Sequence, residues 1–405
     1  MSEGRMMQGF PPAVEDRVTL ANWRRPPFNR WAFQHVRELI PTAAVRNDPA
    51  NVWTLPRDPA DLTALTFADT GGARPSIAEM LRATDTDGFL VLHRGRILTE
   101  DYRHGLDAAT PHILMSVSKS VTGILAGILV GRGLLDPEAP VTDTLPEMAR
   151  SAYGDATLRH LLDMTAGTAF EEDYLATDGA IVRYREATGW NPPRPADGPS
   201  DLRGFLTGLH ERGAAHGEAF RYVSPNSDLL GWVIERASGQ RFSDLLSEAV
   251  WRPMGAGCEA YVTVDRLGAP RTAGGICVTL RDLARFGQLL LRDGARDGAR
   301  IVPAAWIADL RHGGDLRVWT AGDYAHSFPD WPLRYRSQWY VMGEGEGPYF
   351  GLGIHGQLLY LDPRHDLVVA KVSSQPEPVD DPKDRMTLRA CLAIAAHLSG
   401  YTIGH

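Results

Sequence analysis

Apolar residues recur with two different periods along the chain, and these periods predict where sheet and helix form. From Gly88 the run FLVLHRGRILTEDY has β-rich stretches on either side of Arg94-Gly95, which predicts a hairpin. A second hairpin is predicted over residues 358–374, LLYLDPRHDLVVAKVSS, and apolar residues at helical spacing predict an amphipathic helix over residues 386–398. Antiparallel sheet is therefore expected at both ends of the chain.

The remaining segments have other patterns. Residues 1–85 are rich in Pro, Asp and Arg with weak periodicity, whereas residues 120–272 show mostly helical patterns separated by long loops. We therefore predict an α+β fold with an N-terminal wrapping segment (1–85), a sheet domain built from 86–119 and 273–405, and an inserted all-helical domain (120–272). The cleft between the two domains is the expected place for an active site.

Composition and charge exclude several classes of protein. The 405 residues carry 42 basic and 50 acidic side chains of interspersed sign, a net charge of −8, so no nucleic-acid partner is expected. No apolar run approaches the ~18 residues that a membrane span needs. Residues 1–20 lack the basic and apolar regions of an export signal, which predicts a cytoplasmic protein. The cysteines, Cys258, Cys277 and Cys391, are expected to be reduced, and no metal site or cofactor is expected because the histidines are dispersed.

The segment MSVSKS (115–120) opens an apolar-periodic run and predicts the start of a helix. Lys119 lies three residues after Ser116, about one turn further on the same face, so its amine can reach the serine hydroxyl. Ser116 would sit at the positive end of the helix dipole, where free N–H groups stabilise an oxyanion. Lys is rare in this chain and, unlike Arg, a buried Lys can lose its proton. The alternative is an N-cap serine followed by a lysine that reaches solvent.

Two further segments carry candidate chemistry. Tyr222 and Ser224 lie on a predicted loop, RYVSPNS (221–227), and a tyrosine beside a cationic lysine would ionise more easily and act as a general base. In YFGLGIHGQ (349–357) glycines within a strand would let another backbone, such as an acyl substrate, approach closely, and the Ile354 N–H would complete an oxyanion hole. The alternatives are an ordinary turn with a packed aromatic, and an edge bulge with a core or rim histidine, His355.

In this order the three segments resemble the superfamily of serine β-lactamases, penicillin-binding proteins and esterases, over most of residues 85–375. Supporting segments are GLLDPEAPV, LRHLLDMTAG (158–167), YVSPNSDLLGWVIERASG (222–239) and AGGICVTLRDLARFG (273–287). Within the superfamily the chain resembles the nylon-oligomer hydrolases, which cleave 6-aminohexanoate dimers. That resemblance includes residues 22–45, EEDY (171–174), GIHGQ (353–357) and LDP (361–363).

The resemblance implies a serine β-lactamase-like fold and a set of roles. Ser116 is the acylated nucleophile, Lys119 and Tyr222 are the proton-transfer pair, and the backbone N–H groups of Ser116 and Ile354 form the oxyanion hole. Our own hypothesis is that Tyr222, kept anionic by Lys119, takes the Ser116 proton. Supporting positions are Ser224 and Gly353. The implied substrate contacts are Tyr174, Arg185, Trp190, Ala273, Trp339 and His355. The implied partner is a small ester or amide, and a homodimer is compatible with the resemblance although no pattern in the chain decides it.

Departures from the family patterns bear on the substrate. The chain has Gly351-Leu352-Gly353 where β-lactamases carry Lys-Thr-Gly, so a dedicated β-lactamase is not expected. Arg185 and Ala273 stand where nylon-oligomer hydrolases carry an acidic residue and Asn or His, and an arginine would repel a substrate ammonium. We therefore expect a cytoplasmic serine hydrolase that acts on carboxylic esters first and linear ω-amino amides second. An acyltransferase, or a ligand-binding or sensor protein with the same fold, remains the alternative.

Overall fold

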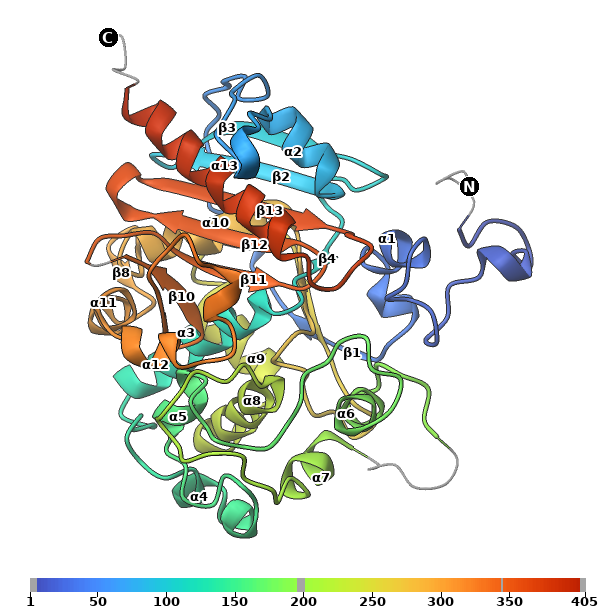
Figure 1. Ribbon diagram of the computed structural model, residues 1–405, viewed down its shortest axis with the longest axis vertical. Helices are drawn as coiled ribbons and strands as arrows, with labels where there is room; N and C mark the ends of the chain where they lie inside the picture. The colour runs from blue at the N-terminus through green and yellow to red at the C-terminus, as the bar shows by residue number, and fades with distance from the viewer. Residues whose placement is uncertain (1–5, 195–200, 344, 401–405) are drawn as a thin grey trace.

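A seven-stranded antiparallel sheet forms the upper part of the molecule in Figure 1, with strand order β3-β2-β13-β12-β11-β10-β9. The computed structural model describes residues 6–194, 201–343 and 345–400, so residues 1–5 and 401–405, at the ends of the first and last predicted segments, lie outside the described residues. The strands are β2 (Thr86–His93), β3 (Arg96–Tyr102), β9 (Leu333–Arg336), β10 (Trp339–Met342), β11 (Tyr349–Gly353), β12 (Gln357–Asp362) and β13 (Leu367–Ser373). Both predicted hairpins are confirmed, as β2-β3 and β12-β13, and β2 pairs with β13.

Helices cover both faces of this sheet and fill the lower part of the molecule (Figure 1). They are α1 (Phe28–Ala32), α2 (Ile77–Ala83), α3 (Val117–Gly131), α4 (Val141–Thr144), α5 (Leu158–Leu162), α6 (Ala180–Ala187), α7 (Leu202–Thr207), α8 (Ser224–Ser238), α9 (Phe242–Leu246), α10 (Leu280–Leu291), α11 (Ala304–His312), α12 (Leu316–Thr320) and α13 (Asp381–Ser399). The amphipathic helix predicted over residues 386–398 is confirmed, since it lies within α13.

Strand β2 shows how the apolar side chains divide between the two faces of the sheet. Phe89 and Val91 belong to the cluster that includes apolar residues of α2 and α13, whereas Leu90 and Leu92 belong to the cluster that includes those of α3 and α10. Successive side chains of a strand point to opposite faces, so a strand between two helical layers is apolar at nearly every position. This packing holds α3 against the sheet, and α3 begins at the candidate nucleophile.

A second, four-stranded sheet joins segments that are distant in sequence. Its order is β1-β5-β6-β4, with β1 (Thr42–Val45), β5 (Ala260–Thr263), β6 (Ile276–Val278) and β4 (His112–Ile113), and a separate two-stranded ribbon pairs β7 (Ala295–Arg296) with β8 (Ala299–Arg300). Strand β5 lies in the stretch where mostly helical patterns were predicted, because its four residues are buried by pairing with β1 and β6. Strand β4 leads directly into the start of α3.

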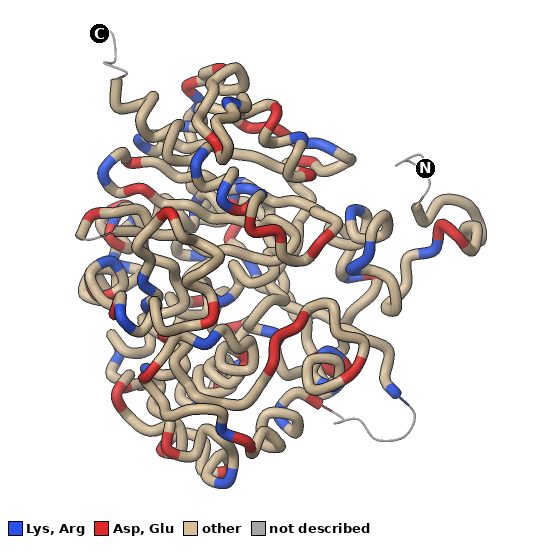
Figure 2. The backbone as a smooth tube through the Cα atoms, in the orientation of Figure 1, with Lys and Arg blue, Asp and Glu red and all other residues tan. Residues whose placement is uncertain are grey.

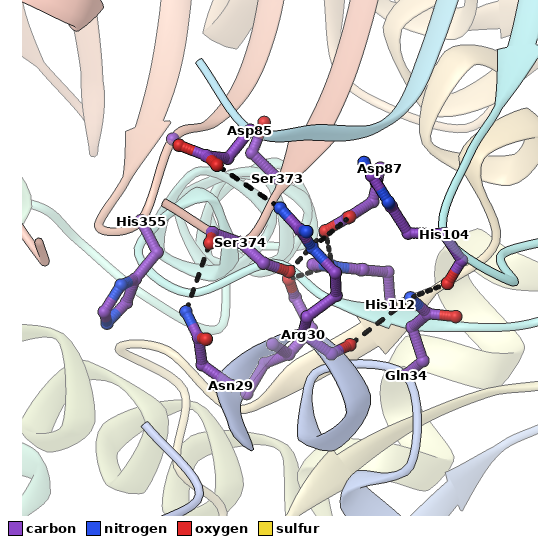
Figure 3. A network of polar contacts seen from close by, with 12 residues as sticks. Asn29, Arg30, Gln34, Asp85, Asp87, His104, His112, His355, Ser373 and Ser374 are labelled. Carbon is purple, nitrogen blue, oxygen red and sulfur yellow. Dashed lines mark hydrogen bonds and ion pairs between the residues drawn. The ribbon is translucent and has the colours of Figure 1, made fainter. Parts of the chain in front are cut away.

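A polar network ties the N-terminal segment to the end of the large sheet beside His355 (Figure 3). The Asn29 side chain of α1 donates to the carbonyl oxygens of Ser374 and Gln375, at 3.2 and 3.1 Å. Asp87 of β2, which is fully buried, lies 3.5 Å from Arg30 Nε and 3.4 Å from His112 Nε2. A buried carboxylate requires such partners, so the network fixes α1 where β2, β4 and β13 meet.

Charges of both signs are interspersed over the backbone (Figure 2). Across the described residues no helix is both long and apolar enough to cross a membrane. Within the same ranges, His, Cys, Asp and Glu form no group of three that could hold a metal ion. All the cysteines are free thiols, as predicted; Cys277 and Cys391 are buried and Cys258 is partly buried.

Candidate active site

Ser116 begins helix α3 directly after a tight turn from strand β4. The backbone N–H of Leu114 donates to the carbonyl oxygen of Ile276 in β6, at 2.9 Å, which ties this turn to the four-stranded sheet. Met115 has a φ of 46°, a left-handed conformation that residues with bulky side chains adopt only where the surrounding structure enforces it. The turn leaves Ser116 9% exposed at the N-terminus of a helix whose apolar residues are buried.

The amine of Lys119 has three polar neighbours within hydrogen-bond distance. Nζ lies 2.8 Å from Ser116 Oγ, 3.0 Å from Ser224 Oγ and 3.0 Å from the carbonyl oxygen of Ala273. A carbonyl can only accept, and Ser224 Oγ gives its own proton to the Glu172 carboxylate, so both of these groups accept from the amine. A neutral amine has two N–H donors and one lone pair. In that state the lone pair of Lys119 is therefore directed at Ser116 Oγ.

Burial sets the charge of the two groups beside Ser116. It lowers the pKa of Lys119 from 10.5 to about 7, with Glu172 opposing the shift, so the neutral amine is present near neutral pH. Lys119 Nζ lies 4.7 Å from the ring centre of Tyr222, whose hydroxyl hydrogen-bonds to Ser116. Burial nevertheless raises the pKa of Tyr222 well above 10. Burial, followed by the nearby Tyr335 and Glu172, therefore argues against an anionic Tyr222, and its role in proton transfer stays a prediction.

Strand β11 ends at Gly353, against the backbone turn that carries Ser116. A Cβ on Gly353 would lie 2.6 Å from the Leu114 carbonyl oxygen and 3.0 Å from Ser116 N, so only glycine allows the two backbones this close. The glycine was expected to let a substrate backbone come close to the strand. In the structure, the backbone of residues 114–116 occupies that place. Within the described part of the chain, no acceptor is hydrogen-bonded to the backbone N–H of Ser116 or Ile354. Both groups are available to bind a developing oxyanion.

We expect Gly353→Ala to reduce kcat/KM for an ester by at least about tenfold, because the added methyl group would push the turn of residues 114–116 away from Ile354 and misplace the nucleophile. Steady-state kinetics with a p-nitrophenyl ester would measure this. Gly208→Ala is the matched control, since its Cβ would meet the nearest atoms at 3.4 Å and it lies away from Ser116. Wild-type kinetics in Gly353→Ala would mean that the two backbones are not so closely packed.

Two small cavities lie at the start of α3, and a larger outer cavity adjoins one of them. The inner cavity, of about 20 Å³, and the tyrosine cavity, of about 40 Å³, both have Ser116, Tyr174 and Ile354 in their walls. The outer cavity, of about 540 Å³, shares Tyr174 and Ile354 with the inner cavity. The inner cavity is further lined by Arg24, Glu172, Arg185, Trp190, Ser224 and Ala273. The tyrosine cavity is further lined by Tyr222, Tyr324, Phe328, Tyr340, Leu352 and Gly353.

The structure brings most of the predicted substrate contacts to these cavities. Those in the wall of the inner cavity are Tyr174, Arg185, Trp190 and Ala273. His355 lines the outer cavity, with its Nδ1 2.7 Å from the carbonyl oxygen of Gln375. Ala273 takes part through its backbone, because its carbonyl oxygen accepts from Lys119.

Trp339 is not brought to the site. It lies on β10 with 0% exposure, its ring meets that of Tyr349 edge-on at 5.3 Å, and it lines neither of the cavities that contain Ser116. The prediction that Trp339 contacts the substrate is therefore wrong. An aromatic residue in a strand covered on both faces packs in the core.

Comparison with known proteins places this arrangement in a family. The profile of the Beta-lactamase family matches residues 68–393, a range that includes the whole seven-stranded sheet and Ser116, Lys119 and Tyr222. The chain belongs to the β-lactamase family. The predicted serine β-lactamase-like fold is confirmed by this match and by a solved structure of a proposed 6-aminohexanoate-dimer hydrolase from Bacillus anthracis. That structure has a TM-score of 0.87 and 26% identity, and the match covers 96% of this chain and 98% of that chain.

Two relatives of this β-lactamase-family protein are named for their activity. A 6-aminohexanoate-dimer hydrolase of Paenarthrobacter ureafaciens is 38% identical over 379 residues, 93% of each chain. Esterase EstB of Burkholderia gladioli is 32% identical over 156 residues, 38% of each chain. The resemblance to the nylon-oligomer hydrolases is thereby confirmed, and the protein is a serine hydrolase of the β-lactamase family.

Glu172 is a residue of this β-lactamase-family site that the sequence analysis did not single out. Its carboxylate accepts from both the backbone N–H and the hydroxyl of Ser224, and from the Tyr174 hydroxyl at 2.6 Å. It therefore fixes the hydroxyl that receives a hydrogen bond from Lys119. The available signal was the EEDY segment, of which only Tyr174 was assigned a role.

Asp228 of α8 is the second residue that sequence analysis missed. It accepts the backbone N–H of Ala273 at 2.7 Å and also pairs with Arg271 and the Tyr184 hydroxyl. This contact positions the Ala273 carbonyl that accepts from Lys119. Asp228 and Ala273 are 45 residues apart, so no local pattern could reveal the contact.

Proposed function

We propose that this protein hydrolyses carboxylic esters through an acyl-enzyme formed on Ser116. The observation that carries the proposal is the environment of Lys119, where two obligatory acceptors leave the lone pair of the neutral amine directed at Ser116 Oγ. The two unpaired backbone N–H groups beside Ser116 support it. A nucleophile, a base and oxyanion donors at one point are the groups that acyl transfer requires.

The first half of the reaction forms the acyl-enzyme. Lys119 Nζ takes the proton of Ser116 Oγ as the oxygen attacks the ester carbonyl carbon, and the carbonyl oxygen becomes an oxyanion held by the N–H groups of Ser116 and Ile354. The tetrahedral intermediate then collapses, and the bond to the leaving oxygen breaks. Tyr222, a neutral phenol, gives its proton to that oxygen and is reprotonated by the Lys119 ammonium. The released product is an alcohol.

The second half returns the enzyme to its starting state. A water molecule gives a proton to Lys119 as its oxygen attacks the acyl carbon, and the oxyanion forms again between the same N–H groups. Collapse breaks the bond to Ser116 Oγ, which recovers its proton from the Lys119 ammonium, and a carboxylic acid leaves. The two halves consume one ester and one water and restore every protein group.

Among substrates we place carboxylic esters first and linear ω-amino amides second. The name of the relative from Paenarthrobacter ureafaciens supports amide cleavage as the second activity. Arg185, in the wall of the inner cavity, is unfavourable for the ammonium of a 6-aminohexanoate dimer. Ester hydrolysis does not depend on an ammonium contact.

Mass spectrometry of the intact protein and of its Ser116 peptide tests this proposal. During turnover of a p-nitrophenyl ester, rapid acid quenching should trap one acyl group on Ser116, and Ser116→Ala should neither acquire the group nor hydrolyse the ester. Ser118→Ala is the matched control, because Ser118 Oγ accepts a backbone bond from Ile276 instead of facing Lys119. Labelling without turnover would identify a sensor, and transfer to an added alcohol in preference to water an acyltransferase. Turnover by Ser116→Ala would refute the proposal.

A further inference from the structure

Two arginines stand between the inner cavity and the outer cavity. Arg24 comes from the N-terminal segment and Arg185 from α6, and both line both cavities. The inner cavity also contains Ser116. A chain that is bound at Ser116 and extends through the inner cavity toward the outer cavity therefore passes both guanidinium groups.

Neither arginine has an anionic partner among the described residues. Arg185 is 6% exposed and donates to the carbonyl oxygen of Tyr174 at 2.9 Å, but it forms no ion pair. Arg24 donates to the Asn191 side chain, and its Nε is buried without a hydrogen-bond partner. Burial lowers the pKa of Arg24 to about 9, and the positive charge of Arg185 adds to the shift. Cations held in this way are stabilised when an anion joins them.

The acidic groups near the arginines make their hydrogen bonds to other residues. Glu172 accepts three hydrogen bonds from Ser224 and Tyr174, and Asp228 is paired with Arg271. Asp173 accepts a backbone bond within its own loop. Glu377 lines the outer cavity but is exposed. Glu172 and Asp173 raise the pKa of Arg185 through their charge but form no ion pair with it, so among the described residues a ligand carboxylate would be the first to contact either guanidinium.

The cavities also indicate which part of the substrate meets the arginines. Tyr222 lines the tyrosine cavity but not the inner cavity. Since Tyr222 delivers the proton to the leaving group, the leaving group occupies the tyrosine cavity. The acyl chain then lies in the inner cavity, beside Arg185 and Arg24.

We propose that the acyl part of the substrate carries a carboxylate, which binds Arg185 and Arg24, so that the enzyme prefers half-esters of dicarboxylic acids. The inference rests on the proposed function, because the acyl-enzyme defines which part of the substrate is the acyl chain. A guanidinium presents two parallel N–H groups that match a carboxylate. An acyl chain that ends in an ammonium meets the same two arginines and is repelled.

Three p-nitrophenyl esters with the same leaving group test the inference. They are the half-ester of hexanedioic acid, its methyl diester as the neutral analogue, and the 6-aminohexanoate ester as the cationic analogue. Each kcat/KM is first divided by the rate constant for spontaneous hydrolysis of the same ester. The corrected value for the half-ester should exceed that for the neutral diester by at least about tenfold, and that for the cationic ester by more. Equal or better hydrolysis of the neutral or cationic ester would overturn the inference.

Substitutions at Arg185 test whether its guanidinium causes the preference for the half-ester. The ratio of half-ester to diester should fall toward one in Arg185→Gln and remain in part in Arg185→Lys, which keeps the charge. Arg183→Gln, two residues earlier on the exposed face of α6, is the matched control and should keep the wild-type ratio. An unchanged ratio in Arg185→Gln would also overturn the inference.

The failure of this inference and that of the proposed function have different signatures. If Ser116 is acylated and the ester is hydrolysed without any preference for the half-ester, only the inference fails. If no ester acylates Ser116, the proposed function fails, and calorimetry with hexanedioate and hexane-1,6-diamine still decides the inference. Binding of the dianion alone supports an anion site, and binding of neither or of the diamine overturns it.

Discussion

Lys119→Met is expected to reduce kcat/KM for a p-nitrophenyl ester by about 10³-fold or more, the upper part of the range for loss of a general base. The reason is geometric: the Lys119 lone pair is directed at Ser116 Oγ, whereas Tyr222, which also hydrogen-bonds to Ser116, is a neutral phenol. Methionine fills a similar volume without an amine, so the loss should lie in kcat. Lys119→Arg should be similarly inactive, because a guanidinium does not release its proton at working pH.

If Lys119 is the base, its pKa also determines how kcat/KM depends on pH. Burial lowers the pKa of Lys119 to about 7, so the fraction of neutral amine rises as the pH increases through 7. The wild-type kcat/KM should therefore rise tenfold per pH unit below this value and level off above it. A profile that is flat between about pH 6 and pH 8 would contradict Lys119 as the base.

Lys383→Met is the matched control for Lys119→Met. Lys383 is partly exposed, pairs with Asp85 and Asp380, and does not itself line either cavity at Ser116. The Lys383→Met variant should retain the wild-type rate and pH profile. Circular dichroism of both variants separates loss of chemistry from loss of fold. Substantial activity in a folded Lys119→Met would exclude the proposed base.

The parts of the site that are local in sequence could be predicted from sequence. Ser116 and Lys119 are one helical turn apart, so their proximity follows from helix geometry alone. The hairpins β2-β3 and β12-β13 follow from apolar runs on either side of short turns. Tyr222 and Ile354 are distant in the chain; their local segments suggest chemical roles, and the resemblance to a known superfamily links those roles to Ser116. Their roles stay predictions, but the structure places both beside Ser116.

The other properties of the site depend on burial and on contacts between distant residues. A local sequence pattern does not reveal either of these. The nearness of Lys119 predicts an anionic Tyr222, yet burial of the phenol raises its pKa. Trp339 was expected at the substrate because aromatic residues serve both recognition and packing, and only its 0% exposure distinguishes the two. Glu172 and Asp228 act on Lys119 through Ser224 and Ala273, contacts made only in the folded chain.

Tyr222→Phe is expected to affect substrates according to their leaving groups. With an ethyl ester, whose alkoxide must be protonated as it leaves, kcat/KM should fall by about 10²-fold to 10³-fold. With a p-nitrophenyl ester, whose phenolate leaves without a proton, the loss should be smaller than about tenfold. Both rates are measured on the same enzyme preparation, so the ratio does not depend on the active fraction.

This contrast separates the two roles that Tyr222 could have. A base that removes the Ser116 proton acts before the leaving group departs, so its loss would slow both esters to a similar extent. A donor to the leaving group matters only where a proton is needed. Tyr349→Phe is the matched control, because it removes a buried phenol on β11 that lines neither cavity at Ser116. Equal losses of kcat/KM with both esters would indicate that Tyr222 is the base. The raised pKa of its phenol argues for the donor.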